Sequence, residues 1–319
     1  MYLDVQHRVQ LEYDGFISES SLELRLQPKT TAHQTVSSFV LAVGPPTKVH
    51  RYRDWHDNLV HHVTITKFHD RIEVHSRSLV QTHPAPPSLA ALAEPAPVPH
   101  LPYELYDYLQ LGRPLAPSPR LTAFHRGIAI PKDASLGRQV ELLGAAIHAR
   151  FEYKKNVTRY DSTTEHFLKG GAGVCQDFTH LMLALLRIRH IPCRYVSGYL
   201  HVERQGTEPS QSHAWIEVYS MTQGWIPFDP THNRTVDERY IVVAHGRDYD
   251  DVPPNKGIYR GTARETLHAE VQTDVSAPKP ISTLHEEIRQ IDLPVYQEIA
   301  DRPVERMPTP AEEAAAQQQ

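Results

Sequence analysis

Ten of the chain's 26 prolines fall between residues 84 and 119, and this cluster divides the sequence into two parts. Proline fixes φ and lacks an N–H group, so a run this dense excludes both a sheet ladder and a long helix. We therefore predict an extended linker over 84–119, with a single short helix over 103–111. A chain of 319 residues has room for a domain on either side of it.

The part before the linker, residues 1–83, has the pattern of β-structure. Val5–Leu11 alternates apolar and polar residues with the period of a half-buried strand. Four more β-rich runs follow, at 22–26, 35–43, 59–68 and 71–80. Turn formers at Asp54–Asn58 precede the last two runs. Short strands at this spacing predict an all-β, sandwich-like domain.

The part after the linker has a mixed α and β pattern. Apolar residues spaced by three and four predict helices over 136–151 and, most strongly, over 174–189, where Pro192 follows. Strand-like runs come next, at 193–202, 213–219 and 225–228. We assign 120–275 to this second domain and 276–319 to a C-terminal extension. The extension is expected to hold a helix over 281–300 and a disordered, low-complexity tail from 308.

Composition excludes several classes of protein. No apolar run approaches about 18 residues, and Met1–Gln10 lacks the pattern of a signal peptide. Two cysteines cannot form a secreted disulfide framework. A net charge of −5 with interspersed signs argues against a nucleic-acid or membrane surface. We expect a soluble, cytoplasmic protein with no nucleic-acid or membrane partner; its oligomeric state is open.

The 21 histidines invite a metal-binding interpretation, which the spacing does not support. His56, His61 and His62 form a loose group without other ligands nearby, and we interpret them as solvated. The acidic residues from Asp248 to Asp251 lack the glycine and distal glutamate of a calcium loop. No metal and no cofactor are therefore expected. Cys193, within a predicted strand, is interpreted as a core residue.

Cys175 stands at the start of the strongest predicted helix, directly after Gly170–Gly173. A thiol there faces unpaired backbone N–H groups and the positive end of the helix dipole, and both favour the thiolate. The N–H of Cys175 is also a natural donor to an oxyanion. By position alone, a small buried hydrophobic residue is the other interpretation.

His213 and Asp229 are expected to meet on neighbouring strands. His213 begins one strand-like run, and Asp229 follows the next, which a hairpin-like link over 220–224 joins to it. Antiparallel pairing would bring the carboxylate beside the imidazole and fix its tautomer, so that the imidazole can serve a thiol. Each residue alone has an ordinary interpretation, a surface histidine and a turn-forming Asp-Pro. Taken together, however, Cys175, His213 and Asp229 stand at the positions that nucleophilic catalysis requires, which the separate interpretations do not explain.

Four segments carry a family resemblance: Gly173–Phe178, Ile191–Tyr199, Ser212–Trp215 and Phe228–Thr231. They resemble the bacterial transglutaminase-like proteins, and residues 246–254 and the N-terminal β region are similar to further parts of that family. Asp57 departs from its pattern, in which glycine is usual. The resemblance implies an α+β fold, with a sandwich-like β domain and a papain-like core whose Cys-bearing helix packs on an antiparallel sheet.

The resemblance implies a thiol enzyme with Cys175 as nucleophile, His213 as general base and acid, and Asp229 as the group that orients the histidine. A protein or peptide would be its substrate, attacked at a carboxamide or peptide bond through a thioester that an amine or water resolves. Transglutamination, deamidation and proteolysis all fit. The alternative is a non-catalytic binding or assembly module with the same fold.

Five further residues are candidates for substrate binding. Gly173 and Gln176 flank the thiol, and Trp215, Trp225 and Tyr160 are expected to line the cleft. For the two tryptophans, the interpretation as core aromatics on a sheet face is favoured over a place in the cleft. Tyr153 or Tyr160 is a candidate second oxyanion donor.

Overall fold

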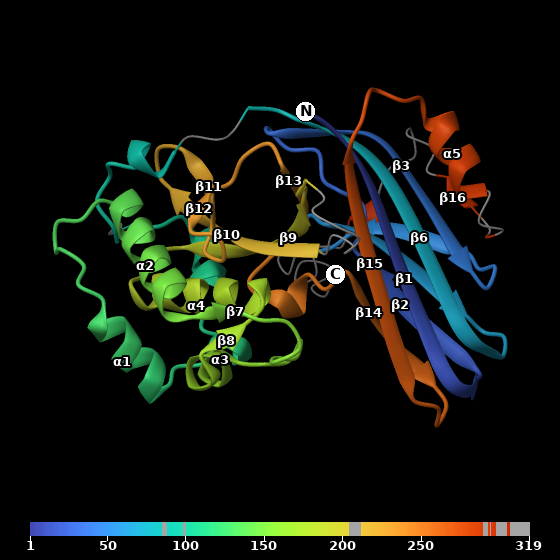
Figure 1. The fold of residues 1–319 in the computed structure, drawn as a ribbon, viewed down its shortest axis with the longest axis horizontal. Coiled ribbons are helices and arrows are strands. Elements are labelled where there is room, and N and C mark those ends of the chain that lie inside the picture. Colours follow the sequence, from blue (N-terminus) through green and yellow to red (C-terminus); the bar gives the residue numbers. More distant parts are fainter. Residues whose placement is uncertain are drawn as a thin grey trace, which may run out of the picture.

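The computed structural model describes residues 1–84, 88–97, 100–203 and 212–289, together with 293, 295–297 and 305–306. Figure 1 shows a β domain of long strands beside a mixed core, whose helices gather on the side of the core sheet away from those strands. This arrangement confirms the predicted α+β class. Among the described residues, no helix combines the length and apolar character needed to cross a membrane.

The β domain consists of two five-stranded sheets. The first has the order β15-β1-β6-β3-β16 and the second β14-β2-β5-β4-β17. The strands from the first part of the chain are β1 (Tyr2–Ile17), β2 (Glu19–Leu24), β3 (Gln34–Gly44), β4 (Val49–Arg53), β5 (Leu59–Ile65) and β6 (His69–Thr82). Buried residues of both sheets, such as Leu11, Leu24, Val63 and Ile72, form one apolar core between them. The alternation read from the sequence therefore does mark a sandwich.

Strands from the far end of the sequence complete both sheets. β15 (Glu265–Val275) pairs with β1 over eleven registered positions, and β14 (Asn255–Arg260) pairs with β2. Two short strands, β16 (Val295–Gln297) and β17 (Glu305–Arg306), pair with β3 and β4. Residues 255–275, which we expected in the second domain, thus hydrogen-bond with the strands of the first (Figure 1).

The core sheet has the order β12-β11-β10-β9-β13. Its strands are β9 (Cys193–Leu200), β10 (Ser212–Ser220), β11 (Gly224–Asp229), β12 (Arg234–Thr235) and β13 (Tyr240–Gly246). α4 (Cys175–Ile188) packs on β10 and β9, and the apolar core there includes Ala214, Ile216 and Val218 of β10. His213, Trp215 and Glu217 alternate with these residues along the strand, as period 2 predicts.

The core holds further helices and short strands. They are α1 (Pro119–Gly127), α2 (Leu136–Arg150), α3 (Thr164–Gly170), β7 (Glu152–Tyr153), β8 (Ala172–Gly173) and the 3₁₀ turn η4 (Tyr249–Asp251). The helix predicted from the periodicity of 136–151 is α2, which ends one residue earlier. Cys193 is fully buried in the same core, as predicted.

The proline-rich segment is a strap that packs on the core. It contains the 3₁₀ helices η1 (Leu89–Ala91), η2 (Tyr103–Leu109) and η3 (Arg113–Leu115), the second of them close to the predicted short helix. Leu89, Leu92 and Leu115 are buried in the core cluster. At the C-terminal side, α5 (Ile281–Arg289) covers Val40 and Ala42 of β3 and is shorter than the predicted helix. The tail predicted from 308 lies outside the described residues.

Two side-chain amides of the β domain cap β13, which forms one edge of the core sheet. Asn58 donates from Nδ2 to the carbonyl of His245 and accepts from its N–H, both at 2.8 Å. Gln34 makes the same pair of bonds with Val242, also at 2.8 Å each. Each amide replaces a strand partner on an otherwise open edge. Asp57, before Asn58, has φ of 59°, the region that favours the glycine usual there in the family.

The histidines correct one expectation. His61 is fully buried, and His56 bonds from Nε2 to Asp251 at 3.1 Å, so neither is solvated as we had interpreted them. Burial lowers the pKa of His7 and of His245 to about 4, and that of His180 to about 3. Much of the histidine excess is therefore interior and uncharged.

Candidate active site

Cys175 is the first residue of α4, so its N–H belongs to the first turn and has no partner within the helix. The thiol is partly buried against the core. Asp177, two residues into the helix, accepts the N–H of Val174 at 2.8 Å and the Thr158 hydroxyl at 2.7 Å. These bonds hold the segment before the thiol in place.

Gly173 is required where it stands. A Cβ atom on Gly173 would lie 2.5 Å from Oδ2 of Asp177 and 2.8 Å from the ring of Phe167. Gly173 also pairs with Tyr153 between the parallel strands β8 and β7. Its backbone therefore links the start of α4 to the segment that carries Tyr153.

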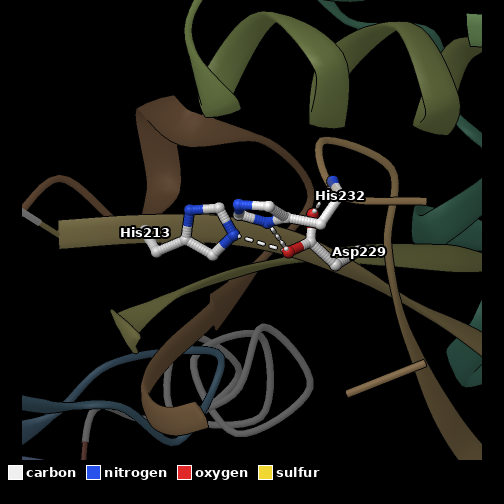
Figure 2. A group of neighbouring side chains, drawn as sticks. All are labelled: His213, Asp229 and His232. Carbon is white, nitrogen blue, oxygen red and sulfur yellow. Dashed lines mark hydrogen bonds and ion pairs between the residues drawn. The ribbon is translucent and has the colours of Figure 1, made fainter. Parts of the chain in front are cut away.

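His213 and Asp229 meet across β10 and β11, as predicted. The two strands are antiparallel neighbours, with Ile216 opposite Phe228. Nε2 of His213 and Oδ2 of Asp229 are 2.8 Å apart (Figure 2). This bond leaves Nδ1 as the ring nitrogen available to a thiol, and the Cys175 side chain is near enough to raise the pKa of His213.

Asp229 is fully buried and accepts five hydrogen bonds. Oδ2 accepts from His213, from Nδ1 of His232 at 2.7 Å and from the Tyr240 hydroxyl at 2.7 Å. Oδ1 accepts the N–H groups of Thr231 at 2.8 Å and His232 at 3.2 Å. Burial raises the pKa of Asp229, but the bonds from His213 and His232 outweigh burial and hold that pKa well below its usual range. The carboxylate is thus charged and fixed.

The charges around His213 favour its protonated form. Burial lowers the pKa of His213, but its hydrogen bonds to Asp229 and Cys175 outweigh burial and raise that pKa to about 10. The protonated ring is thus held by the Asp229 carboxylate on one side and lies near the Cys175 side chain.

Tyrosines surround the thiol. Burial raises the pKa of Tyr153 to about 12, and the nearby charge of Cys175 adds to this. The same two causes raise the pKa of Tyr249 to about 12 and that of Tyr195 well above its ordinary value. All three phenols are therefore protonated at neutral pH. Tyr153 is 46% exposed.

The five residues predicted to bind substrate do not lie together: three are near the start of α4, and two line a separate cavity. Gly173 and Gln176 flank the thiol, but the Gln176 side-chain amide donates to the Tyr160 carbonyl at 2.7 Å and so holds that loop. Tyr160 is 66% exposed.

Trp215 and Trp225 line a different space. Together with Arg194, Glu217 and Tyr240 they line a cavity of about 300 Å³ between the core sheet and the β domain. Cys175 does not line this cavity among the described residues, so the cavity is separate from the thiol. Trp215 is fully buried, so the core interpretation holds for it, whereas Arg194 covers the ring of Trp225 at 4.2 Å.

His232 and Tyr240 are the members of the site that sequence reasoning missed. His232 stands three residues after Asp229, and an i, i+3 spacing across an Asp-Pro turn was an available signal. Tyr240 lies on β13, whose place in the sheet no local pattern gives. Nitrogen atoms of His213 and His232 and an oxygen of Asp229 all lie within 4.8 Å of one another, a set of the kind that holds a metal ion.

Comparison with known proteins points to one family. Residues 123–230 match the model of the transglutaminase-like superfamily, and residues 3–81 match that of the bacterial transglutaminase-like N-terminal region. An uncharacterized protein of Mycobacterium leprae is 33% identical over 275 residues, which cover 84% of this chain and 96% of that protein. A protein-glutamine gamma-glutamyltransferase of Pseudomonas aeruginosa is 30% identical over 112 residues, 30% of this chain and 16% of that protein.

A solved structure shares the whole architecture. It comes from Cytophaga hutchinsonii and is provisionally described as a cysteine protease; the TM-score is 0.71 at 21% identity. The match covers 88% of this chain and 93% of the other. At this identity the likeness concerns the fold, which includes both the β domain and the core.

Proposed function

Because the chain belongs to the transglutaminase-like superfamily and carries the N-terminal region of its bacterial members, we propose that it is a thiol enzyme that transfers acyl groups from carboxamides or peptide bonds. Cys175 is the nucleophile, His213 the general base and acid, and Asp229 the group that orients His213. The observation that carries the proposal is the bond of 2.8 Å between Nε2 of His213 and Oδ2 of Asp229, on a ring whose pKa the nearby Cys175 side chain also raises.

The first half of the reaction forms a thioester. The Cys175 thiolate attacks the carbonyl carbon, and the C–N bond breaks as His213 gives its Nδ1 proton to the leaving ammonia or amine. Asp229 keeps the Nε2–H of His213 in place and stabilises the positive ring. The acyl group is then bonded to sulfur, and His213 is neutral.

The second half returns the enzyme to its starting state. An amine or a water molecule attacks the thioester while the neutral His213 takes its proton at Nδ1, and the C–S bond breaks to release the Cys175 thiolate. An amine acceptor gives transglutamination; water gives deamidation or proteolysis. The same residues serve every route, so the acceptor decides the product.

We assign two donors to the oxyanion that forms in each half. One is the N–H of Cys175, which the first turn of α4 leaves without a helical partner. The other is the Tyr153 hydroxyl, whose raised pKa keeps its proton in place beside the sulfur. Of the two tyrosines considered from the sequence, Tyr153 is the better candidate.

The expected partner is a protein or peptide that presents the acyl donor. A cytoplasmic location stays a prediction from the sequence. The alternative of a non-catalytic binding module would have no use for a charged, fully buried Asp229 bonded to a histidine that contacts a thiol.

Three parallel assays test the proposal: incorporation of a fluorescent primary amine into casein, ammonia release from glutaminyl peptides, and cleavage of a peptide library. We expect at least one activity in the wild type and its loss in Cys175→Ala. Cys193→Ala, at the other cysteine, is the matched control and should keep the activity. Activity that survives in Cys175→Ala, or its absence from the wild type in all three assays, would contradict the proposal.

A further inference from the structure

His232 is a group that the proposed reaction does not use. It follows β11 on the turn after Asp229, and its Nδ1 bonds to the same carboxylate oxygen that receives His213 (Figure 2). The two imidazole rings lie 5.2 Å apart between centroids. The His232 side chain is 43% exposed, whereas Asp229 is fully buried, so solvent reaches the group from the His232 side.

The three ligand atoms suit a first-row divalent cation. Two imidazole nitrogens and one carboxylate oxygen are a common zinc ligand set, in which bonds of about 2.0–2.2 Å leave a fourth position to water. The atoms already lie within 4.8 Å of one another. Small rotations of the two rings would open the space, because each nitrogen now touches the carboxylate through a hydrogen bond of 2.7–2.8 Å.

Surrounding bonds hold the carboxylate ligand in place. Tyr240 donates to Oδ2, and the N–H groups of Thr231 and His232 donate to Oδ1. Such outer bonds orient a ligand and typically change metal affinity by 10- to 100-fold. The Asp229 carboxylate is therefore already charged and oriented in the absence of a metal ion.

We propose that Zn²⁺ binds reversibly to Nε2 of His213, Oδ2 of Asp229 and Nδ1 of His232, with water as the fourth ligand, and that the bound ion stops the thiol chemistry. Binding replaces two protons. The Nε2 proton of His213 is released to solvent, and the Nδ1 proton of His232 moves through solvent to the other nitrogen of that ring.

The effect on the reaction follows from the ring nitrogen that remains. A ring that coordinates Zn²⁺ through Nε2 stays protonated at Nδ1, and it gives up that proton only by becoming an imidazolate. It can neither pass a proton to the leaving amine nor take one from the acceptor. This consequence rests on the proposed function, whereas the binding of Zn²⁺ does not.

Binding is tested first, without activity. Isothermal titration of Zn²⁺ into Cys175→Ala, which lacks the thiol, is compared with the same protein carrying His232→Gln or His268→Gln. His268 is an exposed histidine on β15 and serves as the control. We expect one tight equivalent in Cys175→Ala, the same with His268→Gln, and affinity at least tenfold weaker with His232→Gln. Equal binding in all three, or no tight equivalent, would overturn the proposal.

The second measurement concerns inhibition. If the wild type is active, Zn²⁺ should inhibit it and a chelator should restore it, while His232→Gln, compared with its own uninhibited rate, should need at least tenfold more Zn²⁺. Equal sensitivity of the two proteins would contradict the inhibitory role. An inactive wild type that still binds Zn²⁺ through His232 would leave the metal site standing and refute the enzyme alone.

Discussion

At the scale of single residues, Asp229 is the fixed point of the site. It accepts five hydrogen bonds, and the one from His213 decides which ring nitrogen faces Cys175. A neutral amide in its place would keep the shape but lose the charge that stabilises the imidazolium.

Asp229→Asn should therefore lower kcat by about 100-fold or more, since loss of the orienting carboxylate costs up to about 10⁴ in a serine triad. Steady-state kinetics on the best substrate measure this. Asp237→Asn, at a half-buried acid paired with Arg239, should leave kcat within about twofold. A small effect at Asp229, comparable to that at Asp237, would count against its orienting role.

Tyr153 is expected to act on the transition state. Tyr153→Phe should lower kcat by about 10- to 100-fold with little change in KM, because a lost oxyanion donor acts on the developing charge alone. Tyr160→Phe, at an exposed tyrosine whose carbonyl rather than hydroxyl is bonded, should have kcat within about twofold of the wild type. A raised KM with unchanged kcat in Tyr153→Phe would assign that ring to substrate binding instead.

The sequence was informative about the three expected site residues because each follows a local rule: the start of a helix, the start of a strand, the end of its hairpin partner. It was uninformative about Tyr240, which reaches Asp229 from β13 through strand order alone. The two tryptophans show the converse limit. The alternation along β10 correctly places Trp215 on the face opposite the apolar residues that pack on α4. That face, however, is turned toward the β domain rather than toward a cleft at Cys175.

At the scale of elements, the start of α4 depends on a glycine and an acid. Gly173 and Asp177 are so close that the cap on Val174 exists only because Gly173 has no side chain. Gly173 is thus needed for the geometry of the helix start, whether or not the glycine-rich segment also lets substrate approach.

Gly173→Ala should displace Asp177, cost about 1–2 kcal/mol through the lost cap, and reduce activity by moving Cys175. Urea unfolding and kcat measure the two effects. Gly170→Ala is the matched control, since a Cβ there meets nothing within 4 Å. Equal stability of the two variants would show that the segment relaxes without cost.

The elements that local periodicity marks, β1, α2 and α4, were predictable, because each buries one face along its own length. β14 and β15 were not, since their place depends on pairing with strands about 230–270 residues away. The helix predicted over 281–300 is shorter in the described residues and ends at Arg289.

At the scale of the whole molecule, the β domain holds an edge of the core sheet. The amides of Gln34 and Asn58 satisfy the backbone of β13, the strand that brings Tyr240 to Asp229. The β domain thus supports the site through β13 without contributing a reacting group to it.

Asn58→Ala leaves the buried N–H and carbonyl of His245 unpaired, which should cost about 2–6 kcal/mol at about 1–3 kcal/mol for each group. Urea unfolding gives the value, and Glu12→Ala, at an exposed residue of β1, should stay within about 0.5 kcal/mol of the wild type. A similarly small change for Asn58→Ala would mean that water replaces the amide.

Buried neutral histidines should make the fold sensitive to acid. His7, His180 and His245 take up protons near pH 6.5 when unfolded but only near pH 3–4 when folded. The unfolded state therefore binds more protons as pH falls below 6.5, and each histidine costs up to about 1.4 kcal/mol per pH unit. His213, with a raised pKa, keeps its contribution in this range.

Urea unfolding at pH 7 and pH 5 should thus show a loss of several kcal/mol. In His180→Gln the loss per pH unit should be smaller by about 1.4 kcal/mol, the share of one proton. The side-chain oxygen of glutamine can still accept the Tyr249 N–H that His180 now accepts at 3.2 Å. A flat pH dependence in the wild type would contradict the neutral, buried state of these rings.

The most direct test of the central claim is the rate of alkylation of Cys175 by iodoacetamide between pH 6 and pH 9, read by peptide mass. Cys193, fully buried and with its pKa raised by burial to about 11, is the internal control. A thiolate held by the His213 imidazolium should react quickly and almost independently of pH, whereas His213→Gln should react slowly at pH 6 and accelerate like an ordinary thiol of pKa about 8.5. A wild-type rate that rises with pH as it does in His213→Gln would contradict the activated thiol.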